Sequence, residues 1–165
     1  IIEIGVKKNM NDIVIYYSRT GKTKLVAKTI AKEIAADTQE IKDLTNRSGL
    51  RGFVKGVIDI KFNANTEISP ERVDLKDYDT IYIGSPVWGA RIAPAIMQLV
   101  NNCDFEGKNV ITFVTMSGSG SDNALSELNN QIKTKKGNIT NSFAIITKNT
   151  DIPKLTKKAL KDLEN

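Results

Sequence analysis

The stretch Ile13–Thr23, IVIYYSRTGKT, decides the fold, because an apolar run ends abruptly in a loop of hydroxyl groups, one glycine and two cations. The run is short, β-branched and aromatic, as is typical of a buried strand. Beyond it, Val26, Ile30 and Ile34 recur with helical spacing. The loop is therefore expected between a strand and the start of a helix, where unpaired backbone N–H groups and a partial positive charge stabilise an anion such as phosphate.

The loop itself carries groups that suit a phosphate monoester. Ser18, Thr20 and Thr23 can add hydroxyl donors, and Gly21 allows the backbone to come close. The end of the loop matches the P-loop of nucleotide hydrolases, but the first glycine of that motif would fall at position 16, which is Tyr16. No G-x-G-x-x-G dinucleotide motif follows the strand. The simpler alternative is an ordinary strand–helix turn with solvated hydroxyls.

The length of 165 residues and the hydrophobic content of 40% fit one globular domain, which we expect over residues 10–165. Residues 1–9 precede an internal methionine, Met10. We expect them to be a disordered leader, an extra edge strand, or a non-native extension ahead of a true start at Met10. The apolar stretches are too short to span a membrane and no signal peptide is recognisable, so we expect a cytoplasmic protein.

Residues that usually perform catalysis or bind metals are scarce. The chain has no histidine, which excludes histidine-based triads and histidine–metal sites. Its single cysteine, Cys103, can form no internal disulfide and cannot hold an iron–sulfur cluster. We therefore assign no catalytic and no metal-binding residue, and we expect a bound cofactor to supply any demanding chemistry.

The formal net charge is +5, and the excess lysines are clustered near the ends of two helices. The clusters are Lys133, Lys135 and Lys136, and Lys154, Lys157, Lys158 and Lys161. A solvated surface is the simpler interpretation, and attraction to an acidic partner or an anionic substrate is the alternative. Nucleic acid is disfavoured, because no aromatic side chains are interleaved with these lysines for base stacking.

Strands and helices are expected to alternate five times along the chain. Strands are expected from Ile13, at Thr38–Asp43, at Thr80–Gly84, at Asn109–Met116 and at Asn141–Thr147. The helices that follow them have apolar faces within Val26–Ile34, Leu50–Phe62, Ile92–Cys103, Leu125–Ile132 and Ile152–Leu163. The second helix also carries a basic stripe, which is most simply solvated and otherwise holds an anion or a partner. The stripe is Arg47, Arg51 and Lys55.

Five alternating units predict an α/β fold, a doubly wound five-stranded parallel sheet with helices on both faces. The polar second strand belongs at an edge, which favours the strand order 2-1-3-4-5. In that order the chain reverses direction between strands one and three, and a crevice opens at their carboxyl ends. The loops that meet there are Ser18–Thr23, Ser85–Ile92 and Ser117–Ser121, so we predict a ligand site built from these three loops.

The second of these loops contains the only tryptophan of the chain, Trp88. Pro86 and Gly89 flank it, which indicates a surface loop, although a core position for Trp88 is the alternative. Together with a phosphate-binding loop and a Ser/Gly-rich loop, an exposed indole suits a phosphorylated planar ring. Gly89 can turn its peptide to offer a carbonyl to a ring N–H.

The three loops, in this order, resemble the cofactor-binding loops of flavodoxins, and the lack of a long insertion near the last strand resembles the short-chain members. The resemblance covers about Met10–Asn165 and implies flavin mononucleotide (FMN) as cofactor. It implies that the first loop wraps the phosphate, that Trp88 stacks on the isoalloxazine, that Gly89 lies near flavin N5, and that the third loop lines the other side of the ring. The cofactor-binding residues that it implies are Ser18, Arg19, Thr20, Gly21, Lys22, Thr23, Ser85, Pro86, Val87, Trp88, Gly89, Ser117, Gly118, Ser119 and Gly120.

By this resemblance, the protein shuttles electrons through FMN between redox partners, and the alternative is an FMN-dependent NAD(P)H:quinone-type reductase. The expected partners are redox proteins or a small-molecule electron acceptor, with no nucleic acid and no membrane, and we expect a monomer or a homodimer. A response-regulator receiver shares the topology but needs acidic residues at strand ends, where this chain has Ser18 and Ser85.

Two features depart from familiar flavodoxins. Those carriers are acidic and generally lack cations in the phosphate loop, whereas this chain is basic and places Arg19 and Lys22 there. These two cations either neutralise the phosphate or face an anionic partner. The third loop also lacks the aromatic and acidic residues often found beside the flavin, and the more open ring that this implies would suit a reductase.

Overall fold

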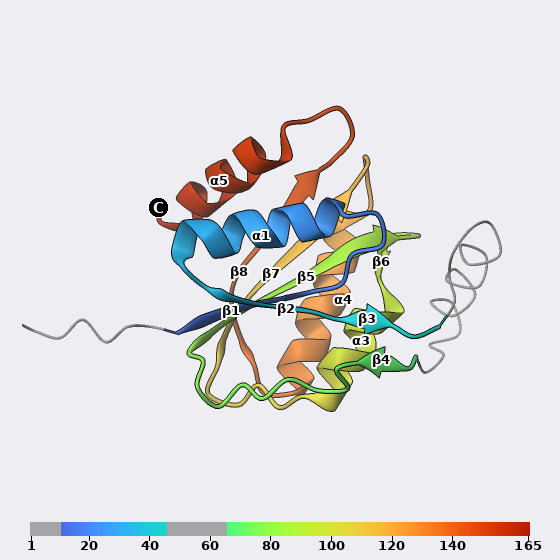
Figure 1. The fold of residues 1–165 in the computed structure, drawn as a ribbon, viewed down its shortest axis with the longest axis vertical. Helices are drawn as coiled ribbons and strands as arrows, with labels where there is room; N and C mark the ends of the chain where they lie inside the picture. The colour runs from blue at the N-terminus through green and yellow to red at the C-terminus, as the bar shows by residue number, and fades with distance from the viewer. Residues whose placement is uncertain (1–10, 46–65) are drawn as a thin grey trace, which may run out of the picture.

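The fold of residues 11–45 and 66–165 is described by a computed structural model (Figure 1). It is built on a parallel sheet with the strand order β2-β1-β5-β7-β8. The strands are β1 (Asp12–Tyr16), β2 (Asp37–Glu40), β5 (Thr80–Trp88), β7 (Asn109–Met116) and β8 (Asn138–Ile146). The order confirms the predicted doubly wound sheet, because the chain moves from β1 to one edge and then returns to build the other side.

Some predictions lie outside the described residues. They concern the leader at residues 1–9, the helix expected within Leu50–Phe62, and the basic stripe of Arg47, Arg51 and Lys55. Within the described ranges, no helix is both long enough and apolar enough to cross a membrane.

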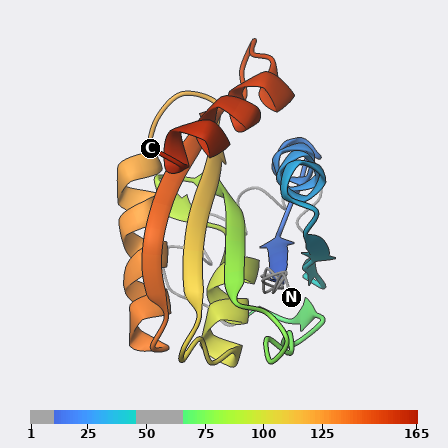
Figure 2. The ribbon, with the colours of Figure 1, turned by 90° about the vertical axis from the view of Figure 1, so that its left-hand side faces the viewer.

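Helices cover both faces of the sheet, as Figures 1 and 2 show. The helices are α1 (Lys22–Ile34), α3 (Pro94–Asn102), α4 (Ser121–Thr134) and α5 (Ile152–Leu163). Helices α1 and α5 lie against each other over one face, and α3 and α4 lie over the other. Two hydrophobic clusters result, one on each side of the sheet.

Strand β1 shows why the central strands are continuously apolar. Ile13 and Ile15 belong to the cluster beneath α3 and α4, whereas Val14 and Tyr16 belong to the cluster beneath α1 and α5. Successive side chains of a strand point to opposite faces, so a sheet covered on both faces requires an unbroken apolar run. The edge strand β2 has only exposed and half-buried residues, which agrees with its polar sequence.

The predicted second strand, Thr38–Asp43, is divided between two sheets. Strand β2 takes its first part, and β3 (Lys42–Asp43) pairs antiparallel with β4 (Ile68–Ser69). The division falls at the buried Ile41, which donates its backbone N–H to the carbonyl of Tyr16 at 2.7 Å. The prediction of one strand was wrong because alternation of polar and apolar residues does not show which partner a strand pairs with.

Strand β8 begins three residues before the predicted Asn141. Ile139 pairs with Val110 and Asn141 pairs with Ile111, so Thr140 is an extra residue in the register. Such a bulge breaks the alternation of faces along the strand. The predicted start was late because the residues ahead of the bulge do not continue the pattern that follows it.

Candidate functional site

Three connections meet at the carboxyl edge of the sheet (Figure 1). They are the loop at residues 17–21 before α1, the hairpin between β5 and β6 (Arg91–Ile92), and the loop at residues 117–120 before α4. Arg19 of the first loop contacts Trp88 of the hairpin, and Gly120 of the third loop lies against Ala90 of the hairpin turn. The elements that follow or precede the loops add two hydrogen bonds, from Asn123 of α4 to Ala90 and between Thr23 of α1 and Thr115 of β7. The structure thus brings together the three loops that the sequence analysis selected.

The first loop leads into a helix start that is open to an anion. Gly21 is the N-cap of α1 in the left-handed conformation, with φ 92°, and no side chain among the described residues caps the helix there. Ser18 Oγ accepts a hydrogen bond from the Gly21 N–H at 3.1 Å. The N–H of Leu25 donates to the Gly21 carbonyl at 3.0 Å, so the N–H groups of residues 22–24 precede the helical ladder. These groups and the helix dipole favour a bound anion.

Space and further donors surround this helix start. A Cβ atom built on Gly21 would meet no described atom within 4 Å. Arg19, Thr20 and Lys22 are exposed and supply guanidinium, hydroxyl and ammonium donors. By charge, donor chemistry and space, the first loop fits a phosphate group.

Thr23 has a different surrounding from the other loop hydroxyls. Its side chain is buried, and its Oγ1 lies 2.7 Å from Oγ1 of Thr115 near the end of β7. This hydrogen bond connects the first turn of α1 with the strand that leads to the third loop. The Thr23 hydroxyl is therefore engaged by the protein, although the sequence analysis named it as a phosphate donor.

The second connection is a hairpin and not the loop that the sequence predicted. Strand β5 continues to Trp88, and Val87 and Trp88 pair antiparallel with β6. Gly89 and Ala90 form the two-residue turn with φ angles of 55° and 62°, as in a type I′ turn. The prediction failed because Pro86 and Gly89 were read as loop signals, and because an alanine at positive φ is not recognisable from sequence.

Two side chains of α4 hold this hairpin in place. Asn123 Nδ2 donates to the carbonyl of Ala90 at 2.7 Å. Arg91 donates from Nε to Glu127 Oε2 at 2.9 Å and from Nη2 to Oε1 at 3.0 Å. The Arg91 and Glu127 side chains are only 29% and 18% exposed, so the paired geometry is stronger than that of an ordinary surface ion pair. Sequence reasoning missed both α4 residues, although their spacing of four places them on one helix face.

Trp88 is half-buried at the margin of the core beneath α3 and α4. The Tyr17 ring approaches it edge-on, with ring centroids 5.7 Å apart and an interplanar angle of 82°. The guanidinium carbon of Arg19 lies over the indole, 5.8 Å from its centroid, which is a cation–π arrangement. Trp88 therefore combines the two interpretations that the sequence left open, because it packs on the core and is also half-exposed beside Arg19 of the first loop.

Ser85, another residue that the sequence assigned to the cofactor, is fully buried in β5. Its Oγ accepts the backbone N–H of Ala93 at 2.9 Å and donates to the carbonyl of Pro86 at 2.9 Å. The hydroxyl thus fixes the turn of chain into α3, since Ala93 is the N-cap of that helix.

The third loop is exposed at Ser117, Gly118 and Ser119 and ends at Gly120, the left-handed N-cap of α4 with φ 95°. A Cβ atom on Gly120 would lie 2.9 Å from the Cα of Ala90, so only glycine permits this close approach to the hairpin. At Gly118, by contrast, a Cβ atom would meet no described atom within 4 Å. The loop is therefore tight against the protein at one end and open at the other.

The described residues offer no cluster of three or more cysteine, aspartate or glutamate side chains that could hold a metal ion.

Tyr16, at the end of β1, is the titratable group just before the first loop. Burial, followed by the negative charge of Glu40, raises the pKa of Tyr16 to about 12. Its phenol is therefore protonated at neutral pH, and the charge of the site comes from the helix starts and the exposed cations.

A model of the flavodoxin family matches residues 11–154, which is most of the chain. The chain belongs to the flavodoxin family. The family predicted from the three loops is thereby confirmed, and the match spans all three of them. A comparison with curated proteins found no match.

Solved structures share the fold of this flavodoxin at low sequence identity. A candidate flavoprotein from Bacteroides uniformis has a TM-score of 0.79 at 23% identity, over 92% of this chain and 98% of that one. A flavoprotein from Lactobacillus acidophilus, solved in complex with FMN, has a TM-score of 0.74 at 22% identity, over 94% and 99%. Oxidised flavodoxin 1 from Bacillus cereus has a TM-score of 0.58 at 17% identity, over 94% and 98%.

Proposed function

We propose that this flavodoxin binds FMN and carries electrons between redox partners. The observation that carries the proposal is the meeting of three loops at an open helix start, within the family match at residues 11–154. The similar flavoprotein from Lactobacillus acidophilus was solved with FMN. FMN combines the two chemical features that the loops suit, a phosphate monoester and a planar ring.

The phosphate is proposed to bind at the start of α1. The left-handed Gly21 leaves the N–H groups of residues 22–24 ahead of the first helical hydrogen bond. Hydrogen bonds from these groups and the helix dipole stabilise a dianion, and the exposed Thr20 and Lys22 add donors. Thr23 is proposed to act by position, because its hydroxyl bonds to Thr115.

The ring is proposed to bind beside the hairpin and the third loop. Gly89 and Gly118 have no described atom within 4 Å of a built Cβ, so the backbone can come close to a flat ligand at both positions. Trp88 offers an aromatic surface beside them, and Arg19 lies over that indole. If the flavin ring stacks on the same face of the indole, the Arg19 guanidinium has to move away from it.

When bound, FMN supplies reversible one- and two-electron transfer, and the protein supplies binding, orientation and access. The proposed partners are redox proteins or a small-molecule electron acceptor, and not nucleic acid or a membrane. We also propose the cytoplasm as location, with which a chain that can form no internal disulfide is compatible.

The visible spectrum of the purified protein, with mass identification of any released chromophore, tests this function. We expect a flavin spectrum as purified or after addition of FMN, and FMN as the released molecule. A colourless protein that takes up no added FMN would refute the proposal.

Turnover then separates the carrier from an FMN-dependent NAD(P)H:quinone-type reductase. A carrier needs a separate reductase, so we expect slow NAD(P)H oxidation by the purified protein and accumulation of a one-electron-reduced spectrum. Rapid NAD(P)H oxidation without an added reductase would establish the alternative instead.

A further inference from the structure

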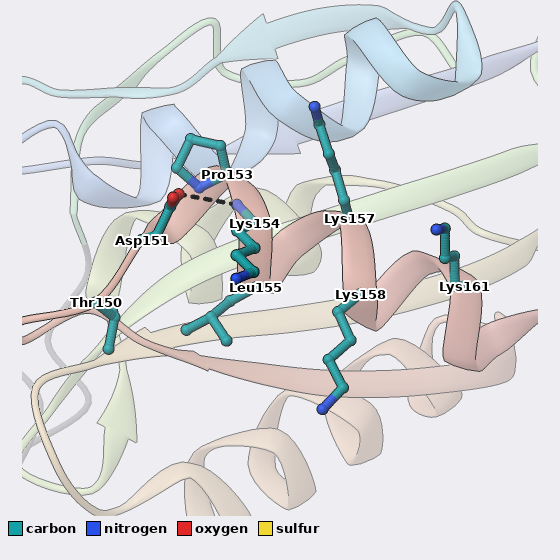
Figure 3. A pocket seen from close by; sticks show the side chains of 8 residues that line it. All are labelled: Thr150, Asp151, Pro153, Lys154, Leu155, Lys157, Lys158 and Lys161. Carbon is teal, nitrogen blue, oxygen red and sulfur yellow. Dashed lines mark hydrogen bonds between the residues drawn. The ribbon is translucent and has the colours of Figure 1, made fainter.

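Helix α5 presents a strongly basic surface. Lys154, Lys157, Lys158 and Lys161 are all exposed. With about 100° of rotation per residue, their spacing confines them to an arc of about 100° around the helix. These four side chains form the lysine face (Figure 3). The opposite side of α5 packs on the sheet through Ile152 and its apolar neighbours.

Only part of this charge is neutralised by the protein. Lys157 pairs with Glu33 of α1 at 3.5 Å. Among the described residues, no carboxylate forms an ion pair with Lys154, Lys158 or Lys161. Three neighbouring cations are therefore available to an external partner.

The four lysines themselves line a wide, open surface depression, together with other residues between positions 150 and 158 (Figure 3). Pro153 and Leu155 are half-buried and contribute apolar surface between the lysines. Asp151 also lines the depression, but its carboxylate accepts the backbone N–H of Lys154 at 3.1 Å and caps the helix. Apolar surface framed by charged groups is typical of a protein-docking site.

The amino-terminal end of α5 and the proposed flavin site both lie at the carboxyl ends of the sheet strands. Thr147 donates its N–H and its hydroxyl to the carbonyl of Met116, at 2.8 and 3.2 Å. Met116 is the last residue before the third loop, so the connection from β8 to α5 starts beside that loop. A partner seated on the first turns of α5 is therefore near the edge where the flavin is proposed to bind.

The composition of the lysine face favours an acidic protein over other anionic partners. Single-stranded nucleic acid is held by aromatic stacking as well as by charge, and no aromatic residue lines the depression among the described residues. A membrane-surface helix needs a large exposed apolar side, whereas the apolar side of α5 is packed on the sheet. Carboxylates on a protein surface match the spaced lysines and accelerate encounter.

We propose that the lysine face is the docking surface for an acidic redox protein. The proposal rests on the proposed electron-transfer function, because it concerns the partner of that reaction. Charge complementarity would steer the acidic partner to the carboxyl ends of the strands, where the flavin is proposed to bind. In this arrangement the flavoprotein supplies the positive charges and its partner the negative ones, the reverse of what is expected for an acidic carrier.

Stopped-flow electron transfer tests the lysine face. The FMN-loaded, reduced protein is mixed with an acidic haem protein, cytochrome b5, and separately with a basic one, cytochrome c. We expect the second-order rate constant with the acidic protein to fall about tenfold between ~0.01 M and ~0.2 M salt, as for steered association. We expect K154E/K158E to lower it about tenfold at low salt.

The matched control is K76E/K133E, which changes the net charge equally at exposed lysines outside α5. We expect it to change the rate constant less than about threefold. Equal losses in both double variants would overturn the proposal, because only net charge would then matter. A rate constant that does not change with salt concentration would also overturn the proposal, as would the absence of detectable electron transfer to both haem proteins.

Flavin titration and thermal unfolding of every variant distinguish a failure to bind FMN or to fold from a failure to dock the partner. A wild-type protein that fails to bind FMN refutes the proposed function and the docking surface together. Normal FMN affinity with unchanged transfer in K154E/K158E overturns the docking surface alone. A neutral quinone as acceptor should react equally with all variants, which separates loss of docking from damage to the flavin site.

Discussion

The hydroxyl oxygens of Thr23 and Thr115 lie 2.7 Å apart, although the two residues are 92 positions apart in the chain. Thr115→Val keeps the shape of the side chain and leaves the buried Thr23 hydroxyl without this partner. We expect the free energy of unfolding to fall by about 1–2 kcal/mol. FMN affinity should fall about threefold or more, because the first turn of α1 loses its tie to β7. Denaturant unfolding and flavin fluorescence titration measure the two effects.

Thr156→Val is the matched control for the threonine bond. Thr156 is fully buried and donates to the carbonyl of Ile152 at 2.8 Å, on the far side of α5 from solvent. This variant should lose stability without a change in FMN affinity. Similar FMN affinity in the Thr115 and Thr156 variants would remove the proposed link between that bond and the site.

Gly21→Ala tests the backbone conformation at the start of α1. A Cβ atom there meets no described atom, so the expected cost is conformational and comes from φ 92°. We expect about 1 kcal/mol of lost stability and about tenfold weaker FMN binding, since the N–H groups shift. Gly118→Ala has equal space without a positive φ and should leave stability nearly unchanged. Equal losses of unfolding free energy in both variants would contradict this explanation.

Glu127→Gln tests the ion pair between Arg91 and Glu127, which holds the hairpin against α4. It removes the charge that holds Arg91 while keeping the side-chain size, and we expect a loss on the order of 1 kcal/mol in unfolding free energy. FMN affinity should fall with it, because the hairpin carries Trp88 and Gly89. Glu106→Gln is the comparison, since Glu106 and Lys136 lie 3.6 Å apart and are 68% and 67% exposed. An equal or larger loss of unfolding free energy in Glu106→Gln would show that the Arg91–Glu127 ion pair has no special role.

Asp12 gives a prediction for the pH dependence of stability. Burial, followed by the charge of Asp79, raises the pKa of Asp12 above its ordinary value of 3.8. Between these two pKa values the folded protein binds more protons than the unfolded chain, so stability falls as the pH rises through this window. Asp12→Asn should therefore stabilise the protein at neutral pH, by an amount on the order of 0.5 kcal/mol because the carboxyl is partly solvated.

The advantage of Asp12→Asn should vanish as the pH falls below 3.8, where the wild-type carboxyl is protonated in both states. Thermal unfolding of both proteins from acidic to neutral pH measures it. Asp77→Asn, at an exposed carboxylate, is the control and should show little effect. A constant difference between wild type and Asp12→Asn at every pH would contradict the assignment.

Local sequence patterns were sufficient for most of the sheet and its helices. Strand β7 has the predicted bounds, Asn109–Met116, because an unbroken apolar run ends at a Ser/Gly loop. Helix α5 occupies the predicted Ile152–Leu163, because its apolar residues follow one helical face and Pro153 fits its first turn. The strand order followed from a single polar edge strand and the chirality of the crossovers.

The missed features depend on contacts between residues distant in sequence. Ala90 adopts a positive φ in the hairpin turn, and Gly120 and Asn123 contact it from another part of the chain. Neither the turn nor these contacts produce a local pattern. The role of the buried Ser85 hydroxyl was also not recognisable from the sequence, because its hydrogen bond to Ala93 joins residues that share no local motif.

The most direct test of the FMN site is a titration of the apo-protein with FMN and with riboflavin, which lacks the phosphate. Several charge-assisted hydrogen bonds at the start of α1 should make FMN bind about a hundredfold more tightly than riboflavin. Equal affinities for the two flavins, or binding of neither, would contradict a phosphate site at Gly21.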